Sequence, residues 1–229
     1  IEAKLDALIS ETTLKPATHA DFAAPIVPVR KADGDVRICG DFSVTVNPFI
    51  VEDKYPLPTP EEIFAKLSGG VEFSTLDMSS AFLQIPIDEE SQKLLTINTH
   101  KGLFHYTRLP FGAAPSTSIL QRRMDNLLQG IPGTAVRVDD IIVTGRDRRE
   151  HEANLRSVLE RFAQTGLKLN LKKCHFFCKE VTYLSHIIDR NGIRPGTDNV
   201  RCILEAPAPK NLSELRSFVG MVNYYAAYV

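Results

Sequence analysis

The feature that most constrains this chain is a pair of adjacent acids, Asp139 and Asp140, between two runs rich in Val and Ile, 135–138 and 141–143. Val and Ile favour strands and Asp favours turns, so the pattern predicts two antiparallel strands joined by a tight turn. Such a turn would carry both carboxylates at the tip of a hairpin. Turn formation alone explains many Asp pairs, so these two acids by themselves leave a purely structural role open.

A third acid strengthens the catalytic interpretation. Residues 73–77 (FSTLD) predict a short strand that ends on Asp77, after which the chain bends through 78–82. Three carboxylates at strand ends and hairpin tips can converge on two magnesium ions, the arrangement that phosphoryl-transfer enzymes use. Asp77, Asp139 and Asp140 are therefore candidate catalytic and metal-binding residues.

The composition is that of an ordinary globular protein. The chain has 229 residues, 43% of them hydrophobic and 24% charged, enough for a core in one domain or two closely packed subdomains. No apolar run approaches the roughly 20 residues of a membrane-spanning helix, so no membrane partner is expected. The four cysteines do not suggest a disulfide framework, which favours a reducing compartment. A start without Met or a signal-peptide pattern predicts a piece of a longer protein.

The basic residues are clustered, although the net charge of −1 argues mildly against nucleic-acid binding. In residues 168–173 (KLNLKK) the alternation predicts a strand with Lys168, Asn170 and Lys172 on one face and leucines on the other. A phosphate track and a solvated strand face are equally good interpretations of this basic stripe.

The remaining patterns predict an α+β fold, because strands and helices follow one another in irregular order. Strands are predicted at 24–29, 36–39, 94–98, 103–108 and 181–188, with a turn at 31–35. Helices are predicted from a capping box at Thr59 and Glu62 to Gly69, and at 116–128, 147–166 and 197–205. A stiff linker at 206–209 precedes a terminal helix that is capped by Asn211 and continues to Val229.

Three segments carry a family resemblance: Leu76–Phe82 (LDMSSAF), Leu109–Gly112 (LPFG) and Val138–Asp140 (VDD). Their order and spacing resemble those of reverse transcriptases, specifically the polymerase domain of gypsy-type long-terminal-repeat retrotransposon Pol polyproteins. The similarity extends from about residue 20 to the end of the chain, and it includes the strings at 55–58, 95–102, 168–177, 192–195 and 223–225. Each string alone is weak evidence, whereas the ordered set is specific.

The resemblance implies a right-hand polymerase with fingers, palm and thumb, in which an antiparallel palm sheet is backed by helices. It divides the chain into a lead-in at 1–24, fingers and palm at 25–205, and at 206–229 a linker with the start of a connecting helix towards a ribonuclease H region. The implied activity is RNA-directed DNA polymerisation, a nucleotidyl transfer from deoxynucleoside triphosphates to a primer on an RNA or DNA template. Other implied partners are the protease, ribonuclease H and integrase of a Pol polyprotein, in a cytoplasmic virus-like particle or, alternatively, the nucleus.

The resemblance also implies roles for single residues. Asp77, Asp139 and Asp140 fall on the positions that hold two Mg²⁺ ions, with Mn²⁺ as an alternative. Arg37 and Lys31 fall in the fingers hairpin that contacts the incoming triphosphate, and Arg37 has the better claim because a planar guanidinium suits bidentate phosphate contacts.

Four further residues receive roles from the same resemblance. Phe82 falls under the nucleotide sugar, where its ring would clash with a 2′-hydroxyl and so select deoxynucleotides. A core phenylalanine is an equally good interpretation of Phe82. Gln121 falls on a family glutamine near the templating base. Lys172 and Lys173 are both candidates for protonating the leaving pyrophosphate, and the sequence does not choose between them.

Three departures from the family pattern define an alternative function. Arg137 stands where a tyrosine usually precedes the paired aspartates, and Ser185 where glycine is usual. In segment 113–120 the proline is displaced by two positions, and Leu120 replaces the usual phenylalanine. The alternative is a catalytically impaired remnant that binds nucleic acid without polymerising.

Overall fold

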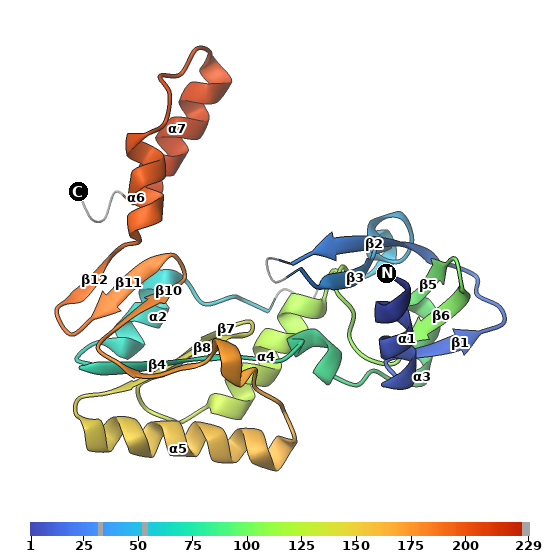
Figure 1. Ribbon diagram of the computed structural model, residues 1–229, viewed down its shortest axis with the longest axis horizontal. Coiled ribbons are helices and arrows are strands. Elements are labelled where there is room, and N and C mark those ends of the chain that lie inside the picture. Colours follow the sequence, from blue (N-terminus) through green and yellow to red (C-terminus); the bar gives the residue numbers. More distant parts are fainter. Residues whose placement is uncertain (32–33, 52–54, 226–229) are drawn as a thin grey trace.

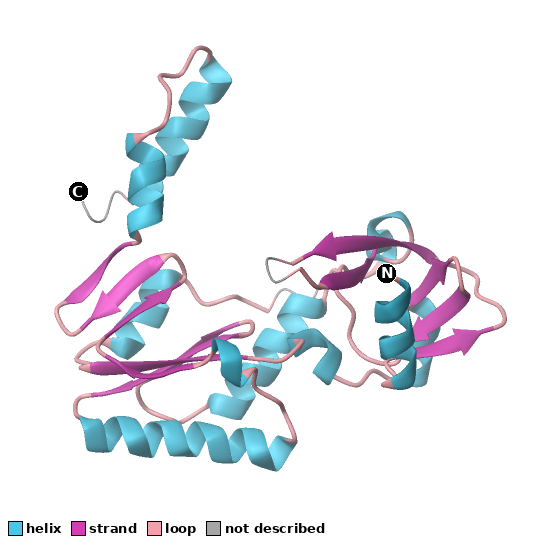
Figure 2. Ribbon diagram, in the orientation of Figure 1, coloured by secondary structure: helices cyan, strands magenta, loops and turns pink. Residues whose placement is uncertain are grey.

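The computed structural model describes residues 1–31, 34–51 and 55–225, which form two lobes with a helical arm. Figure 1 shows the arm, made of α6 (Thr197–Leu204) and α7 (Leu212–Tyr224), standing away from both lobes. Helices and strands are interspersed along the chain (Figure 2), as the predicted α+β class requires.

One lobe is built on a four-stranded antiparallel sheet. Its strands are, in order across the sheet, β7 (Thr134–Arg137), β8 (Asp140–Gly145), β4 (Glu72–Asp77) and β9 (His175–Cys178). Ile141 and Val143 of β8 belong to the core shared with α4 (Ser116–Leu128) and α5 (Arg148–Thr165), whereas Ile142 packs with α2 (Pro60–Leu67). Because both faces of the sheet are covered, β8 is a continuous apolar run instead of an alternating one.

The other lobe is built on a five-stranded sheet. Its strands are, in order, β1 (Leu14–Ala17), β6 (Gly102–Tyr106), β5 (Thr96–Thr99), β2 (Ala24–Arg30) and β3 (Val36–Gly40). Only the pair β2–β5 is parallel among these strands. Helices α1 (Glu2–Ser10) and α3 (Glu89–Leu94) complete the lobe. The segment 1–24, expected to be a lead-in, therefore supplies α1 and β1 to this lobe.

A three-stranded meander connects the four-stranded sheet to the arm. It consists of β10 (Glu180–Tyr183), β11 (His186–Asp189) and β12 (Gly192–Pro195). Val181, Tyr183 and Ile188 pack onto the core around α2, whereas the arm exposes Leu204 and Leu212. In the part of the chain that the structure describes, no helix combines the length and hydropathy needed to cross a bilayer.

The predicted helix ends are confirmed where local capping sets them. Thr59 and Glu62 form the capping box of α2. Asp147 caps α5, which ends at Gly166 in the left-handed region with φ 71°. Asn211 caps α7 by accepting from the backbone N–H of Glu214. Four short 3₁₀ turns complete the described part of the chain: η1 (Phe42–Val44), η2 (Asn47–Phe49), η3 (Ala81–Gln84) and η4 (Leu171–Lys173).

The predicted strand at 168–172 is wrong. Only Leu169 forms a β-bridge, with Met78, and the chain then turns into η4, where the N–H of Lys173 bonds to the carbonyl of Asn170. The basic stripe over an apolar strand face therefore does not form. The bonding partners that bend this segment come from residues about 90 positions earlier in the chain, which the local alternation could not indicate.

Two other boundaries differ from the prediction. The single strand expected at 181–188 is a hairpin, because Leu184 (φ 47°) and Ser185 (φ 65°) turn the chain between β10 and β11. The terminal helix ends at Tyr224, and its expected continuation through 226–229 lies outside the described residues. The same holds for residues 32–33 of the predicted turn, which Gly34 follows with φ 83°.

Candidate active site

The four-stranded sheet brings two of the three candidate acids together. Asp77 is the last residue of β4 and Asp140 the first of β8, and the antiparallel register pairs them directly. Directly opposed residues carry their side chains on the same face, with Cβ atoms about 4.5–5.5 Å apart. Two carboxylates that are far apart in the sequence therefore share one edge of the sheet.

The third acid lies in the two-residue turn between β7 and β8. Val138 and Asp139 form this turn, and Val138 adopts φ 61°, a left-handed conformation that is strained for a β-branched side chain. The side chain of Gln121 stabilises the turn, because its Oε1 accepts from the N–H of Val138 (2.7 Å) and its Nε2 donates to the carbonyl of Val136 (3.2 Å).

Gln121 lies behind the hairpin and not in the cleft. Its side chain is 0% exposed, and its Nε2 also donates to Asp125. The expected position of Gln121 near the templating base stays a prediction, and in this structure its side chain supports the hairpin. Sequence reasoning missed this role because the partner groups are backbone atoms, which leave no side-chain signal.

The carboxylates repel one another. Burial raises the pKa of Asp77, and the charge of Asp139 raises it further, while the nearby Lys173 opposes both effects. Burial likewise raises the pKa of Asp140, with the charges of Asp139 and Asp77 adding to it. A partly buried cluster of like charges is relieved when a cation binds, which is the electrostatic requirement of a metal site.

The three carboxylates fit a divalent cation that completes its coordination shell with ligands from outside the protein. Among the described residues, no three acidic, histidine or cysteine side chains stand close enough to enclose a metal ion by themselves. Mg²⁺ does not require such an enclosure, since it binds one or two carboxylates and completes its shell with water and phosphate oxygens. Asp77, Asp139 and Asp140 supply hard oxygen donors of this kind.

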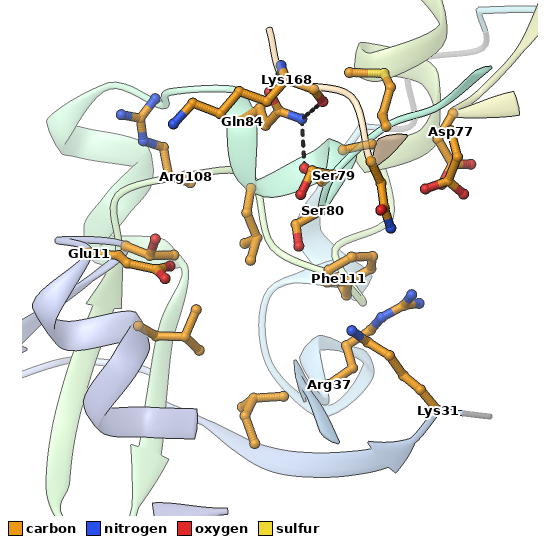
Figure 3. Close-up of a pocket in the computed structure, with 18 of the residues that line it drawn as sticks. Glu11, Lys31, Arg37, Asp77, Ser79, Ser80, Gln84, Arg108, Phe111 and Lys168 are labelled. Atoms are coloured by element: carbon orange, nitrogen blue, oxygen red, sulfur yellow. Dashed lines mark hydrogen bonds between the residues drawn. The ribbon is translucent and has the colours of Figure 1, made fainter. Parts of the chain in front are cut away.

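A cleft of about 660 Å³ separates the acids from the five-stranded lobe. Asp77 and Asp139 of the four-stranded lobe line it, as do Lys31 and Arg37 of the five-stranded lobe. Figure 3 shows Asp77 apart from Lys31 and Arg37, which lie together. The basic residues that line the cleft are Lys4, Lys31, Arg37, Arg108, Lys168 and Lys173. An acidic edge facing a basic wall can bind a phosphate chain between a metal site and cationic side chains.

The other predicted nucleotide residues lie in or beside this cleft. Lys31 bonds to Asp35 through its Nζ (2.9 Å), and the Arg37 guanidinium lies over the ring of Phe111. Phe82 is half-buried, packs against the core of the four-stranded lobe and meets Phe111 edge to face. One side of the Phe82 ring therefore packs against the core, and the ring is neither fully buried nor fully exposed.

The structure distinguishes the two candidate lysines. Lys173 lines the cleft, and its Nζ lies 4.0 Å from Oδ2 of Asp77. Lys172 is exposed and is not among the residues that line the cleft. Lys173 is therefore the candidate with access to a bound phosphate.

The loop after Asp77 is held by a residue that sequence reasoning missed. Gln84 donates from Nε2 to the carbonyls of Ser79 (2.6 Å) and Lys168 (3.0 Å), and its Oε1 accepts from the N–H of Lys168. The N–H of Asn170 bonds to the carbonyl of Asp77 (2.8 Å). These bonds fix the loop that lines the cleft, and no motif in the sequence marks Gln84 for this task.

These features define a class of protein. An antiparallel sheet with carboxylates at the ends of two adjacent strands, facing a basic lobe across a cleft, is the architecture of a right-hand nucleotide polymerase. The family model for "Reverse transcriptase (RNA-dependent DNA polymerase)" matches residues 29–188. The chain belongs to the reverse transcriptase family, and its lobes are accordingly the fingers (five-stranded) and the palm (four-stranded).

Curated relatives agree with this assignment. The chain is 39% identical over 226 residues to the "Uncharacterized protein K02A2.6" of Caenorhabditis elegans, covering 98% of this chain and 18% of that protein. It is 33% identical to the "Retrovirus-related Pol polyprotein from transposon 297" of Drosophila melanogaster, covering 97% of this chain and 21% of that protein. The chain thus spans about a fifth of the length of these relatives, consistent with a long-terminal-repeat retrotransposon domain.

Solved structures confirm the right-hand fold. The foamy viral protease-reverse transcriptase in complex with double-stranded DNA superposes with a TM-score of 0.89 at 29% identity, covering 96% of this chain and 38% of that chain. The same viral protein in complex with an RNA/DNA hybrid gives a TM-score of 0.82 at 29% identity, covering 96% and 30%.

Proposed function

We propose that this chain is an RNA-directed DNA polymerase that uses two divalent cations, Mg²⁺ or alternatively Mn²⁺. The observation that carries the proposal is the pairing of Asp77 with Asp140 at the edge of a cleft whose opposite wall presents Lys31 and Arg37. The arrangement supports transfer of a phosphoryl group between an acidic metal-binding edge and a cationic phosphate-binding wall.

In the proposed reaction the primer 3′-hydroxyl oxygen attacks the α-phosphorus of a deoxynucleoside triphosphate. A new P–O bond forms, the bond from the α-phosphorus to the bridging oxygen breaks, and pyrophosphate leaves. Asp77, Asp139 and Asp140 hold the divalent cations. When bound, these cations lower the pKa of the attacking hydroxyl and neutralise charge on the phosphates. The hydroxyl proton passes to water, and Lys173 gives a proton to the leaving pyrophosphate.

The remaining residues bind and select the nucleotide. Arg37 and Lys31 hold the triphosphate from the fingers side, and the ring of Phe82 excludes a 2′-hydroxyl by contact with the sugar. The template and primer lie along the same cleft, a role supported by the nucleic acids held by the similar foamy viral enzyme. The relative from transposon 297 is a Pol polyprotein, so protease, ribonuclease H and integrase are the proposed neighbours, in a cytoplasmic particle.

A primer-extension assay with Mg²⁺ tests this function. We expect the chain to extend a DNA primer on an RNA template, EDTA to abolish extension, and Asp139→Asn to lower the rate on the order of a hundredfold or more, since it removes a metal ligand. If the unchanged protein and Asp139→Asn both fail to extend the primer, in this chain and in a longer Pol polyprotein that contains it, the proposed activity is ruled out.

A second candidate function follows from Arg137. This cation is the cross-strand neighbour of Asp140, and its charge lowers the pKa of Asp140 against the larger effects that raise it. A long cation beside the carboxylates competes with metal ions for their charge. The candidate is a retroelement remnant that binds nucleic acid without copying it.

Restoring an aromatic ring discriminates between the two candidates. Extension by the unchanged chain supports the active polymerase, whereas extension that only Arg137→Tyr gains supports the impaired remnant and identifies Arg137 as the cause of the impairment. Salt-dependent binding of a primer–template duplex without extension in either protein supports the remnant. Absence of binding to the primer–template duplex even at low salt excludes both candidate functions.

A further inference from the structure

Strand β9 is irregular where it pairs with β4. Phe73 pairs with Cys178, whereas Thr75 pairs with His175, so the register shifts between these two pairs. Two residues of β9 therefore oppose one residue of β4, which defines a β-bulge. Phe177, inside the bulge, adopts φ 54°, a left-handed conformation that is uncommon for a bulky side chain. An extra residue of this kind shifts the alternation of side chains between the two faces of the sheet.

The bulge decides which face of the sheet receives Cys174. In a regular strand, residues four positions apart share a face. Cys174 nevertheless packs in the core beside α4 and α5, whereas Cys178 packs with the residues around α2 on the other face. The Sγ of Cys174 accepts from the N–H of Asp77 (3.5 Å), and Nζ of the preceding residue, Lys173, lies 4.0 Å from Oδ2 of Asp77. The bulge therefore determines the position of the segment that brings Lys173 to the cleft.

Two buried polar residues stabilise the bulge. The N–H of Phe177 donates to Oγ of Ser74 (3.1 Å), and the same oxygen lies 2.9 Å from Nε2 of His151. Ser74 and His151 are both 0% exposed. A buried N–H outside the strand ladder costs free energy unless another group accepts from it, and Ser74 supplies that acceptor.

The ring of Phe177 contacts two side chains of α5. Its centroid lies 4.9 Å from that of the His151 ring and 3.7 Å from the guanidinium carbon of Arg148. Arg148 in turn forms ion pairs with Glu72 (3.0 Å) and Glu152 (2.8 Å). His151 therefore contacts the ring of Phe177 and also the hydroxyl that binds the backbone of the same residue.

We propose that Ser74 and His151 are positioning residues, which stabilise the bulge at Phe177. The bulge in turn sets the position of Lys173 relative to Asp77. This inference rests on the proposed function, in which Lys173 gives a proton to the leaving pyrophosphate. Neither Ser74 nor His151 is among the residues that line the cleft, so both act through the backbone of β9. Loss of the pair should therefore lower the rate of turnover and leave the affinity for the nucleotide nearly unchanged.

Primer-extension kinetics of Ser74→Ala test the proposal. The substitution removes the acceptor of the Phe177 N–H, so we expect kcat to fall about three- to tenfold. The KM for the nucleotide should stay within about twofold. In a Lys173→Ala background the same substitution should change kcat by less than about twofold, because the group that it misplaces is absent. Equal fold-losses of kcat in the two backgrounds would overturn the proposal.

Further variants separate positioning from a general effect on folding. His151→Gln keeps a polar partner for Ser74 and should retain most of kcat, whereas His151→Leu should lose about as much as Ser74→Ala does. Thr144→Val is the matched control, because it removes a buried hydroxyl of the neighbouring strand β8 that donates to the carbonyl of Glu72. It should leave kcat within about twofold. Equal losses of kcat in Thr144→Val and Ser74→Ala, or full kcat in His151→Leu, would contradict the positioning role.

Amide hydrogen exchange tests the bulge without turnover. In Ser74→Ala the amide of Phe177 should exchange at least about tenfold faster than in the unchanged chain. The amide of Lys173, which bonds to the carbonyl of Asn170 on the far side of the bulge, should also exchange faster. Absent extension together with this pattern of exchange counts against the proposed activity alone. Unchanged exchange of both amides in Ser74→Ala overturns the positioning role, whether or not the chain extends primers.

Discussion

At the scale of the residue, a basic side chain of the cleft already contacts a carboxylate, which competes with phosphate for it. Oδ2 of Asp35 accepts from Nζ of Lys31 (2.9 Å) and of Lys4 (3.3 Å), and these bonds hold the pKa of Asp35 well below its ordinary value. Lys31 is also the predicted triphosphate ligand. A phosphate that binds to Lys31 therefore competes for its charge with a carboxylate that is already in contact with it.

Removing this competitor should strengthen nucleotide binding. Asp35→Asn keeps Oδ1 as the acceptor for the N–H of Val36, so the hairpin stays ordered while the negative charge is lost. Exposed ion pairs are worth about 0.2–1 kcal/mol, so we expect the KM for the triphosphate to fall by a factor between about 1.4 and 5. Asp6→Asn, which breaks the ion pair with Lys101 on the same lobe, is the matched control. An unchanged or higher KM for Asp35→Asn would contradict the competition.

At the scale of the element, the Asp-Asp hairpin depends on helix α4. The N–H of Val138 is satisfied by Gln121, a fully buried residue of α4, and not by the opposite strand. Predicting a hairpin from residues 135–143 was correct because strand and turn preferences are local. The support of its tip was not predictable, because it joins a helix and a turn through backbone groups.

Gln121→Leu should therefore loosen the hairpin. The substitution keeps the volume but leaves the N–H of Val138 without its acceptor, which costs about 1–3 kcal/mol of the free energy of unfolding. Urea unfolding measures this loss, and Arg123→Leu, at an exposed position of the same helix, should cost much less. We also expect primer extension to fall more than the folded fraction does. Equal stability of the two variants would show that the bond is dispensable.

The same contrast explains which other elements could be predicted. The caps at Thr59, Asp147 and Asn211 act within one helical turn, so the sequence was sufficient to place them. The segment 168–173 was misassigned because its partners, Met78 and Gln84, belong to a distant loop. The candidate acids were identifiable by type and spacing, whereas the register that pairs Asp77 with Asp140 is a property of the folded sheet.

At the scale of the whole molecule, the stability of the palm should depend on pH through a buried histidine. His151 of α5 is 0% exposed, its Nε2 lies 2.9 Å from Oγ of Ser74, and its Nδ1 has no hydrogen-bond partner among the residues that the structure describes. Burial lowers the pKa of His151, with Arg148 acting in the same direction against Glu72 and Glu152. Burial also lowers the pKa of His105 in the fingers.

The direction of the pH effect follows from the proton count. Below the ordinary histidine pKa of about 6.5 the unfolded chain binds protons that the folded chain rejects, so stability should be highest above this pH and fall as the solution is acidified. We expect each such histidine to cost at most about 1.4 kcal/mol per pH unit between pH 6.5 and its folded pKa. Urea unfolding at pH 7.5 and 5.5 measures the loss.

Two variants identify the group responsible. His151→Gln keeps a polar partner for Ser74 but does not titrate in this range, so its stability should fall less between the two pH values. His19→Gln changes a histidine whose side chain is 84% exposed and should behave like the unchanged chain. An identical pH dependence in all three proteins would exclude His151 as the cause.

The opposition of Asp77 and Asp140 also limits how this chain can change over evolutionary time. Side chains alternate between the two faces of a strand, so a deletion or insertion of one residue inside β4 or β8 would send its acid to the reverse face. Substitutions preserve that alternation, whatever side chain they introduce. Copies of this domain can therefore diverge widely in composition while the lengths of these two strands stay constant.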